Sequence, residues 1–278
     1  MKLCGPIFVE TPDPAAWVAA VKRAGYSAAN LPLDKSADDG MVGAYQEAAA
    51  QAGIVIAEVG AWSNPIDPDP VKASAARKHC QESLAFAERT GAKCCVNIAG
   101  SRNPTKWDGP HPENFSQDTF DLIVETTREI IDAVKPGRTF FALETMPWIF
   151  PSSPDEYLEL IRAVDRPAFA VHLDPVNMIN SPERAYRTGD FIRECFAKLG
   201  PWIKSCHAKD IALREHLTVH LDECQPGLGV LDYRAYLREL AKLDDEIPLG
   251  LEHLSTEREY AAAAEYIRAV AKEEGLSL

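Results

Sequence analysis

The sequence lacks any apolar run long enough to cross a membrane. A helix that spans a bilayer needs about 20 consecutive apolar residues, and no part of the 278-residue chain offers such a stretch. The residues from Met1 to Gly5 also lack the apolar segment of a secretory signal peptide. We therefore expect a cytoplasmic protein without a membrane partner.

Positive charge is also scarce in this sequence. Lysine and arginine total 29 against 42 aspartates and glutamates, which gives a formal net charge of −13. A field of this sign repels the phosphates of nucleic acids and anionic lipid surfaces. We expect no nucleic-acid partner. The absence of an arginine or lysine cluster and of a glycine-rich phosphate cradle also favours an unphosphorylated substrate.

Two further motifs are missing. The seven cysteines are scattered, with Cys94 and Cys95 adjacent, and none forms a Cys-x-x-Cys pair, so we expect reduced and mostly buried thiols. The lone Gly227-Leu228-Gly229 does not make a nucleotide-binding fingerprint, because no Gly-x-Gly-x-x-Gly follows a strand. A composition of 46% hydrophobic and 26% charged residues is typical of a globular protein and excludes disorder.

Short apolar runs alternate with longer helical patterns along the whole chain. The expected strands cover residues 3–9, 26–31, 54–59, 92–98, 139–144, 168–174, 203–207 and 248–252. The expected helices cover residues 14–24, 41–52, 70–90, 116–134, 154–164, 190–199, 232–243 and 257–274. Several strands show no polar alternation, which is typical of parallel strands covered on both faces.

Eight strand–helix units in this length predict a closed (β/α)₈ TIM barrel that forms a single domain over residues 1–278. An open doubly wound sheet is the alternative architecture. The connections favour the barrel, because helix-to-strand turns are short whereas the strand-to-helix segments 99–115, 145–153, 175–189 and 208–231 are long. In a barrel, functional residues lie at the carboxyl ends of the strands.

An ionisable side chain ends each of the last four expected strands. We call these residues the strand-end cluster: Glu144, Asp174, His207 and Glu252. They are separated by about one strand–helix unit each, so a barrel brings them to one rim. Carboxylates gathered in one pocket repel each other unless they are protonated or neutralised by a cation. Oxygen-dominated ligation with one nitrogen predicts a divalent metal, Mn²⁺ or Mg²⁺, with Co²⁺ or Zn²⁺ as alternatives.

Each member of the cluster also has a structural interpretation. Glu144 and Glu252 are compatible with buried salt bridges near the barrel rim. His207 alone is compatible with a core histidine bonded to backbone, although its register with the acids favours ligation.

The order of these residues resembles the xylose isomerase-like TIM barrel superfamily. The phrases that carry the resemblance are Leu143-Glu144, His172-Leu173-Asp174, His207-Ala208-Lys209-Asp210, Pro226-Gly227-Leu228-Gly229 and Leu251-Glu252. It spans nearly the whole chain and is closest to the sugar phosphate isomerase/epimerase group, with its ketose 3-epimerases, hydroxypyruvate isomerase and inosose dehydratase. The resemblance implies that the strand-end cluster holds the metal. It also implies that Glu144 and Glu252 exchange protons with the sugar on opposite faces.

The sequence departs from the ketose epimerases at one position. They usually carry a histidine three residues after the strand-six aspartate, where this chain has Asn177. An asparagine still hydrogen-bonds a hydroxyl, but it narrows the options for proton transfer. The expected substrate-binding residues are Asn177, Lys209, His172, Trp62 and His111.

Most of these residues have a second interpretation. Lys209 either reaches substrate oxygens or neutralises Asp210, and His172 points into the barrel, where it packs or supports the ligands. Trp62, Trp107, His111 and Trp148 either stack on a sugar or roof the pocket. His253 is interpreted as structural. The segment 216–229 is interpreted as a hairpin-like excursion that either closes over the substrate or reconnects to the next helix.

The sequence thus predicts a metal-dependent isomerase or epimerase that acts on a small-molecule carbohydrate by proton transfer next to a carbonyl. A lyase on the same scaffold, acting on an inosose or a keto-glycoside, begins with the same proton abstraction and stays open because of Asn177. An abasic-site endonuclease would need further histidines and a basic surface, which seven histidines and a charge of −13 disfavour. A non-catalytic binding subunit is the fourth hypothesis. A homo-oligomer is compatible with the sequence, although no motif specifies one.

Overall fold

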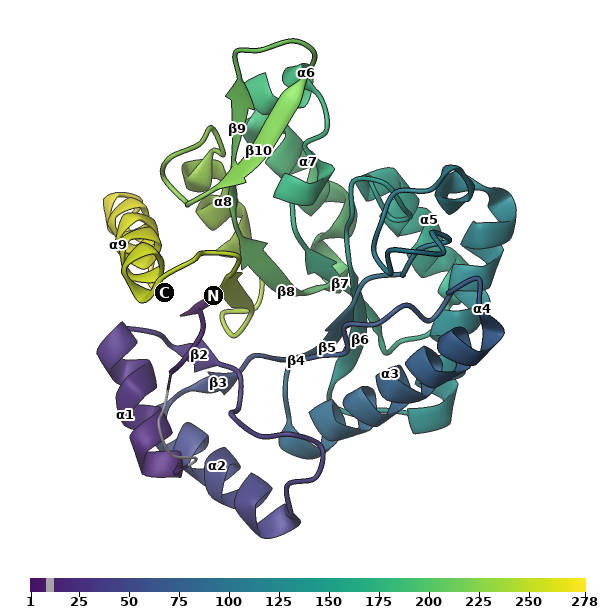
Figure 1. Ribbon diagram of the computed structural model, residues 1–278. Helices are drawn as coiled ribbons and strands as arrows, with labels where there is room; N and C mark the ends of the chain where they lie inside the picture. The colour runs from purple at the N-terminus through teal and green to yellow at the C-terminus, as the bar shows by residue number, and fades with distance from the viewer. Residues whose placement is uncertain (9–12) are drawn as a thin grey trace.

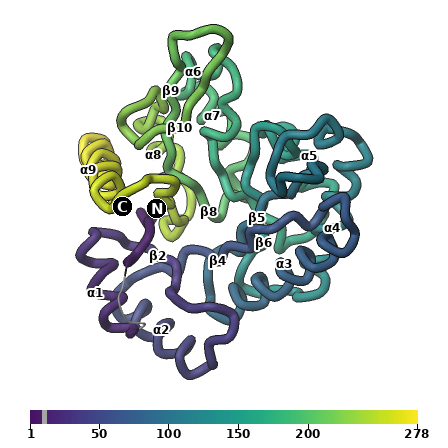
Figure 2. Tube along the Cα trace, viewed as in Figure 1, coloured from purple at the N-terminus to yellow at the C-terminus, as the bar shows by residue number. Residues whose placement is uncertain are grey.

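The structure is a computed structural model that describes residues 1–8 and 13–278. Val9, the last residue of the first expected strand, lies outside the described residues. Figure 1 shows the strands at the centre of the molecule with the helices arranged around them, and Figure 2 shows the same path of the chain as a tube.

The strands within the described residues follow the expected order. They are β1 (Lys2–Cys4), β2 (Ala28–Ala29), β3 (Val55–Ile56), β4 (Glu58–Gly60), β5 (Cys94–Asn97), β6 (Phe140–Glu144), β7 (Phe169–Leu173), β8 (Ile203–Ala208), β9 (Asp210–Arg214), β10 (His220–Cys224) and β11 (Pro248–Leu251). The expected strand 54–59 is divided into β3 and β4, and β2 is shorter than expected. β9 and β10 pair in an antiparallel hairpin that projects away from the barrel in Figure 1.

Backbone pairing closes the barrel. Seven strands form one sheet in the order β1-β11-β8-β7-β6-β5-β4, and Leu3 of the first strand pairs with Leu249 of the last. β2 and β3 form a second parallel ladder. The amide of Ser27 donates to Leu3 O (3.0 Å) and links this ladder to β1. The pairing of first and last strands confirms the barrel and excludes the open doubly wound sheet.

The helices lie where the sequence predicts them. They are α1 (Pro14–Ala24), α2 (Asp39–Ala52), α3 (Pro70–Thr90), α4 (Gln117–Val134), α5 (Pro154–Val164), α6 (Pro182–Tyr186), α7 (Thr188–Leu199), α8 (Tyr233–Leu240) and α9 (Glu257–Glu273), with 3-10 turns η1 (Pro112–Phe115), η2 (Val176–Met178) and η3 (Gly200–Trp202). Local signals fix their ends. Thr256 and Glu259 form a capping box, and Ser153 accepts from the amide of Glu156.

Large apolar side chains pack between the strands and the helices, and small ones fill the barrel interior. Trp17, Tyr45 and Tyr157 are fully buried in the main core. Separate interior clusters consist of Cys4, Ala28 and Ala57, and of Cys94, Val96 and Ala142. These small residues leave room for polar side chains near the barrel axis. All seven cysteines are free thiols and six of them are buried. No helix within residues 1–8 and 13–278 combines the length and apolar character needed to span a membrane.

Candidate metal and active site

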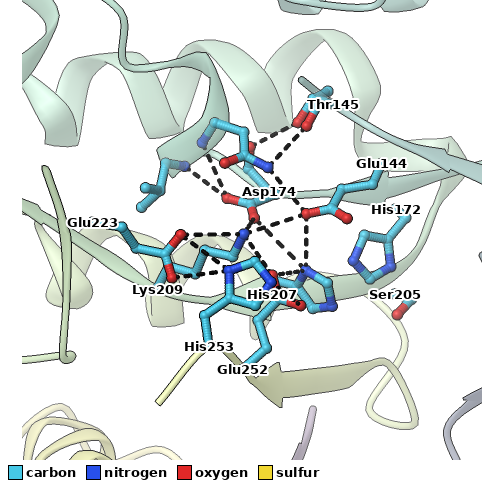
Figure 3. A network of polar contacts seen from close by, with 12 residues as sticks. Glu144, Thr145, His172, Asp174, Ser205, His207, Lys209, Glu223, Glu252 and His253 are labelled. Carbon is cyan, nitrogen blue, oxygen red and sulfur yellow. Dashed lines mark hydrogen bonds and ion pairs between the residues drawn. The ribbon is translucent and has the colours of Figure 1, made fainter. Parts of the chain in front are cut away.

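The barrel brings the strand-end cluster together. Glu144 is the last residue of β6 and His207 lies in β8, while Asp174 and Glu252 directly follow β7 and β11. One donor atom from each of these residues lies within 4.8 Å of the others. Figure 3 shows the side chains pointing toward one another from neighbouring strands. The arrangement follows from parallel pairing, because the carboxyl ends of parallel strands meet at one edge.

The two ring nitrogens of His207 face different surroundings. Nδ1 lies 2.8 Å from Glu252 Oε1, 3.2 Å from Glu144 Oε1 and 3.7 Å from Asp174 Oδ2. Nε2 faces Glu58 Oε1 on the other side of the ring, at 3.9 Å. His207 therefore presents Nδ1 to the carboxylates, which makes Nδ1 the nitrogen available to a shared cation.

Lys209 adds a positive charge that the sequence argument did not count. Its Nζ lies 2.5 Å from Glu252 Oε1, 2.9 Å from Asp174 Oδ2 and 3.5 Å from Glu144 Oε1. The side chain is 2% exposed. The interpretation that Lys209 neutralises Asp210 is therefore wrong, because Lys209 pairs with the carboxylates of the cluster, while the carboxylate of Asp210 accepts backbone amides. Besides protonation or a bound ion, an internal ammonium relieves part of the repulsion among the carboxylates.

The buried charges shift each other's pKa values. Burial raises the pKa of Glu144 above its ordinary value, although His207 and Lys209 lie close by. Burial also opposes ionisation of Glu252, but the charges of His207 and Lys209 outweigh it and lower the pKa of Glu252 to about 2. Lys209 and His207 likewise hold the pKa of Asp174 far below its usual range despite burial. Two carboxylates of the cluster are thus held ionised.

The residues present fit a divalent metal ion. Asp174 Oδ2 and Glu252 Oε1 are buried, and neither accepts a well-aligned hydrogen bond from the described residues, although the ammonium of Lys209 lies 2.9 Å and 2.5 Å from them. Asp174 Oδ1, by contrast, accepts from the amides of Val176 (2.9 Å) and Asn177 (3.2 Å), which leaves Oδ2 aimed at the cluster. Three carboxylates and one imidazole nitrogen are a donor set that suits Mn²⁺ or Mg²⁺.

A cavity of about 750 Å³ opens above the cluster. It is lined by three of the expected substrate-binding residues, Trp62, Asn177 and Lys209. Asn177 Nδ2 donates to Glu144 Oε1 and to Thr145 O, both at 3.0 Å, which orients the carboxylate of Glu144.

The remaining expected contacts lie elsewhere. His172 is completely buried and does not line the cavity, so a direct substrate contact is not what the structure shows. Its ring packs edge-on against His207, with 4.0 Å between centroids. His111 does not line the cavity either. Its Nδ1 accepts a hydrogen bond from the amide of Glu113 and caps the start of η1.

Comparison with known proteins places this architecture in a family. The family model for the xylose isomerase-like TIM barrel matches residues 18–270. The chain belongs to this family. A comparison with curated proteins finds no match.

Several solved structures share the fold of this xylose isomerase-like barrel at low sequence identity. A xylose isomerase-like TIM barrel protein from Mycobacterium smegmatis in complex with magnesium is 18% identical, with a TM-score of 0.66 over 94% of this chain and 90% of that one. D-psicose 3-epimerase with D-tagatose from Clostridium cellulolyticum is 17% identical, with a TM-score of 0.68 over 97% and 99%. Endonuclease IV from Thermus thermophilus is 14% identical, with a TM-score of 0.73 over 98% of both chains. These identities show the fold alone.

Sequence reasoning missed two acids of this xylose isomerase-like barrel. Glu58 of β4 lies beneath His207, where its Oε2 accepts from the hydroxyl of Ser205 (3.3 Å) and lies 3.7 Å from His172 Nδ1. Its signal was a charged residue inside an otherwise apolar run. Glu223 of the hairpin lies 3.1 Å from Nδ1 of His253, and both line the cavity. Glu223 pairs with Ile211 at the base of the hairpin, and nothing local in the sequence brings it beside His253.

The glycine-rich segment of this xylose isomerase-like barrel is tied down. The buried carboxylate of Asp210 accepts four backbone amides, from Ile211, Gly227, Gly229 and Leu231, at 2.9 to 3.1 Å. Of the two interpretations of the hairpin region, reconnection to the next helix fits residues 225–231, and the hairpin itself begins earlier than expected, at Asp210.

Proposed function

We propose that this barrel is a divalent-metal-dependent isomerase or epimerase that acts on a sugar or sugar derivative by proton transfer next to a carbonyl. The observation that carries the proposal is the convergence of three carboxylates and one imidazole, with one donor atom from each lying within 4.8 Å of the others. An epimerase and a magnesium complex of the same fold support it. The net charge of −13 disfavours a nucleic-acid substrate.

The strand-end cluster would hold the ion, with Mn²⁺ or Mg²⁺ as the proposed metal. A divalent ion bound there polarises a carbonyl and acidifies the neighbouring C–H bond. Either Glu144 or Glu252 would remove that proton. The other glutamate would carry a proton back to the sugar. Lys209 donates to substrate oxygens from the cavity floor.

A lyase is the second candidate, because of Asn177. This residue replaces the expected histidine, and its amide group already donates to Glu144 Oε1 and to Thr145 O. An amide has no proton to transfer at neutral pH. The first step would be the same, with loss of a β-substituent in place of reprotonation.

Solvent deuterium exchange tests the common first step. We expect the protein with added Mn²⁺ to exchange the hydrogen beside the carbonyl of a ketose, an inosose or a keto-glycoside in D₂O, as followed by NMR and mass spectrometry. Product analysis then separates epimerisation from elimination. A protein that binds Mn²⁺ but exchanges no hydrogen in any of these substrates contradicts the proposal.

Variants assign the step to the cluster. We expect Glu252→Gln and Glu144→Gln each to lower the exchange rate by roughly 100-fold or more, the range that general acid–base groups contribute. Glu265→Gln, an exposed position on α9, is the matched control and should leave exchange unchanged. Metal analysis of each variant shows whether the loss comes from chemistry or from ligation.

A further inference from the structure

The cavity has a polar floor and an aromatic wall. Glu144 and His207 belong to the floor, at the strand ends. The wall consists of Trp62, Trp107 and Trp148, which come from the segments after β4, β5 and β6. Because these strands are neighbours in the sheet, the three indoles gather on one side of the barrel mouth. A ligand bound at the floor can therefore extend over apolar surface in one direction.

Two of these tryptophans are partly exposed. Trp62 is 43% exposed and Trp107 is 42% exposed. Large aromatic surface that stays in contact with water is unfavourable, and where it lines a cavity with polar groups it marks a surface on which a ligand packs.

Buried hydrogen bonds hold the wall in shape. Asn114 is completely buried, and its Nδ2 donates to Gly109 O (3.2 Å) and to Trp148 O (3.1 Å). Trp148 Nε1 donates in return to Asp108 O at 2.7 Å. The segment that carries Trp107 is thus fastened to the segment that carries Trp148. A wall that is already ordered loses little conformational entropy when it binds a flat group.

Trp62 is held by a close approach to the strand. Its indole lies over Gly60, where a Cβ atom would come within 2.4 Å of Nε1. The missing side chain at Gly60 therefore leaves room for the indole against the end of β4, where it lines the cavity.

The size of the cavity exceeds the need of a single sugar ring. Its volume is about 750 Å³, within the roughly 300–1,000 Å³ typical of pockets for drug-sized ligands. A monosaccharide seated on the strand-end cluster would leave the aromatic wall in contact with water.

We propose that the substrate is a sugar that contains a ketone and carries a flat apolar substituent, as in an aryl keto-glycoside. The sugar oxygens meet the polar floor, and the substituent lies against Trp62, Trp107 and Trp148. The sugar part of this inference rests on the proposed function. The apolar substituent is inferred from the aromatic wall. Aromatic stacking supplies its geometry, since offset and edge contacts between rings are favourable.

Binding without turnover tests this proposal. The probes are phenyl β-glucoside and phenyl β-galactoside, and each is compared with the corresponding methyl glycoside. Titration calorimetry measures their affinities for the EDTA-treated protein. We expect at least one phenyl glycoside to bind about tenfold more tightly than its methyl counterpart, the effect of one good aromatic contact. Trp107→Ala should remove most of that difference, and Trp107→Phe should keep part of it.

The matched control is Tyr186→Ala, since Tyr186 is 78% exposed on α6 and lies outside the cavity lining. It should leave both affinities unchanged. Equal affinity for phenyl and methyl glycosides, no measurable binding of either phenyl glycoside, or tighter binding of the disaccharide cellobiose would overturn the proposal. An equal loss of affinity for the phenyl and the methyl glycosides in Trp107→Ala would also overturn the proposal. These probes contain no ketone and need no metal, so failure of the proton-exchange experiment leaves this result standing, and the converse also holds.

Discussion

His207 connects the strand-end cluster to a fourth carboxylate, that of Glu58, on the other side of its ring. Its Nδ1 faces Glu144, Asp174 and Glu252, while its Nε2 faces Glu58 at 3.9 Å. A histidine that binds a metal usually donates its other N–H to a carboxylate, which fixes the tautomer and makes the ligand nitrogen more basic. Ser205 holds Glu58 in place for this role.

We expect Glu58→Gln to lower the affinity for Mn²⁺ by roughly 10- to 100-fold, the usual effect of removing such a support. The glutamine keeps the size of the side chain. It lacks the negative charge that favours a proton on Nε2 of His207 and so leaves Nδ1 free to bind the metal. Titration calorimetry measures the affinity, and Glu265→Gln serves as the control. An unchanged Mn²⁺ affinity in Glu58→Gln would show that His207 is oriented by other contacts.

His172 makes the stability of the barrel depend on pH. It is completely buried, and neither ring nitrogen has a hydrogen-bond partner among the described residues. Burial, followed by the charge of His207, lowers the pKa of His172 to about 3. The unfolded chain takes up this proton at about pH 6.5. The contribution of His172 to the free energy of unfolding is therefore fully present above pH 6.5 and is lost as the pH falls toward 3.

We expect the free energy of unfolding of the EDTA-treated protein to fall by about 1 kcal/mol between pH 7.5 and 5.5 from this group alone. His172→Gln should lack that part of the fall, as urea unfolding at both pH values would show. A bound cation would lower the pKa of His172 further, so the sign holds for the metal-loaded protein as well. If the two proteins lose the same stability over this interval, His172 is not the titrating group.

The strand-end residues could be predicted from the sequence, whereas their neighbours could not. Glu144, Asp174 and Glu252 each end an apolar run, and parallel pairing alone brings such positions to one rim. Glu58 and Glu223 enter the site from β4 and from the hairpin. Their positions depend on how far the strands shift against each other and on where the hairpin leaves the barrel, which are tertiary properties.

Among the elements, the segment 225–231 shows how one buried carboxylate orders a loop. Asp210 collects four amides, and two of them belong to glycines that approach it closely. A Cβ atom at Gly229 would come within 2.3 Å of Asp210 Oδ1 and 2.4 Å of Ile211 O. The backbone contact leaves no room for a methyl group.

We expect Gly229→Ala to lower the free energy of unfolding by about 1–3 kcal/mol, because the added methyl group forces the backbone to move. Gly43→Ala is the matched control, since Gly43 lies in α2 and a methyl group added there would meet nothing within 4 Å. At that position the same change should stabilise the protein by about 0.5–1 kcal/mol through helix propensity. Thermal and urea unfolding measure both. Equal effects of the two substitutions would contradict this account of the loop.

Helices were predicted closely because their signals are local, as at Ser153 and Thr256. Strand limits were not, because a strand ends where its neighbour ceases to pair. The expected strand 26–31 keeps only Ala28 and Ala29 in the ladder with β3. The hairpin of β9 and β10 begins at Asp210, before the hairpin-like excursion expected over residues 216–229.

Across the whole molecule, the barrel is closed unevenly. β6 and β7 share four consecutive paired residues, whereas β2 and β3 share two. The β2–β3 ladder is joined to β1 through the amide of Ser27. The strand-end cluster lies on β6, β7, β8 and β11, which belong to the continuous sheet. The site is therefore built on the part of the barrel with the more extensive pairing.

We expect hydrogen exchange to follow this division. Regions with few ladder hydrogen bonds open locally at a lower free energy than continuous sheets, so amides of β2 and β3 should exchange at least about tenfold faster than those of β6 and β7. Saturating Mn²⁺ stabilises the conformations that bind it in proportion to ln(1 + [L]/Kd). Bound Mn²⁺ should slow exchange in β6, β7, β8 and β11, because opening of these strands disrupts the strand-end cluster and releases the metal. It should leave exchange in β2 and β3 nearly unchanged, because these strands can open while the cluster still binds Mn²⁺. Mass spectrometry of peptic peptides with and without Mn²⁺ measures both effects, with Mn²⁺ plus EDTA as the control. Uniform protection by Mn²⁺ would mean that β2 and β3 open only together with the rest of the barrel.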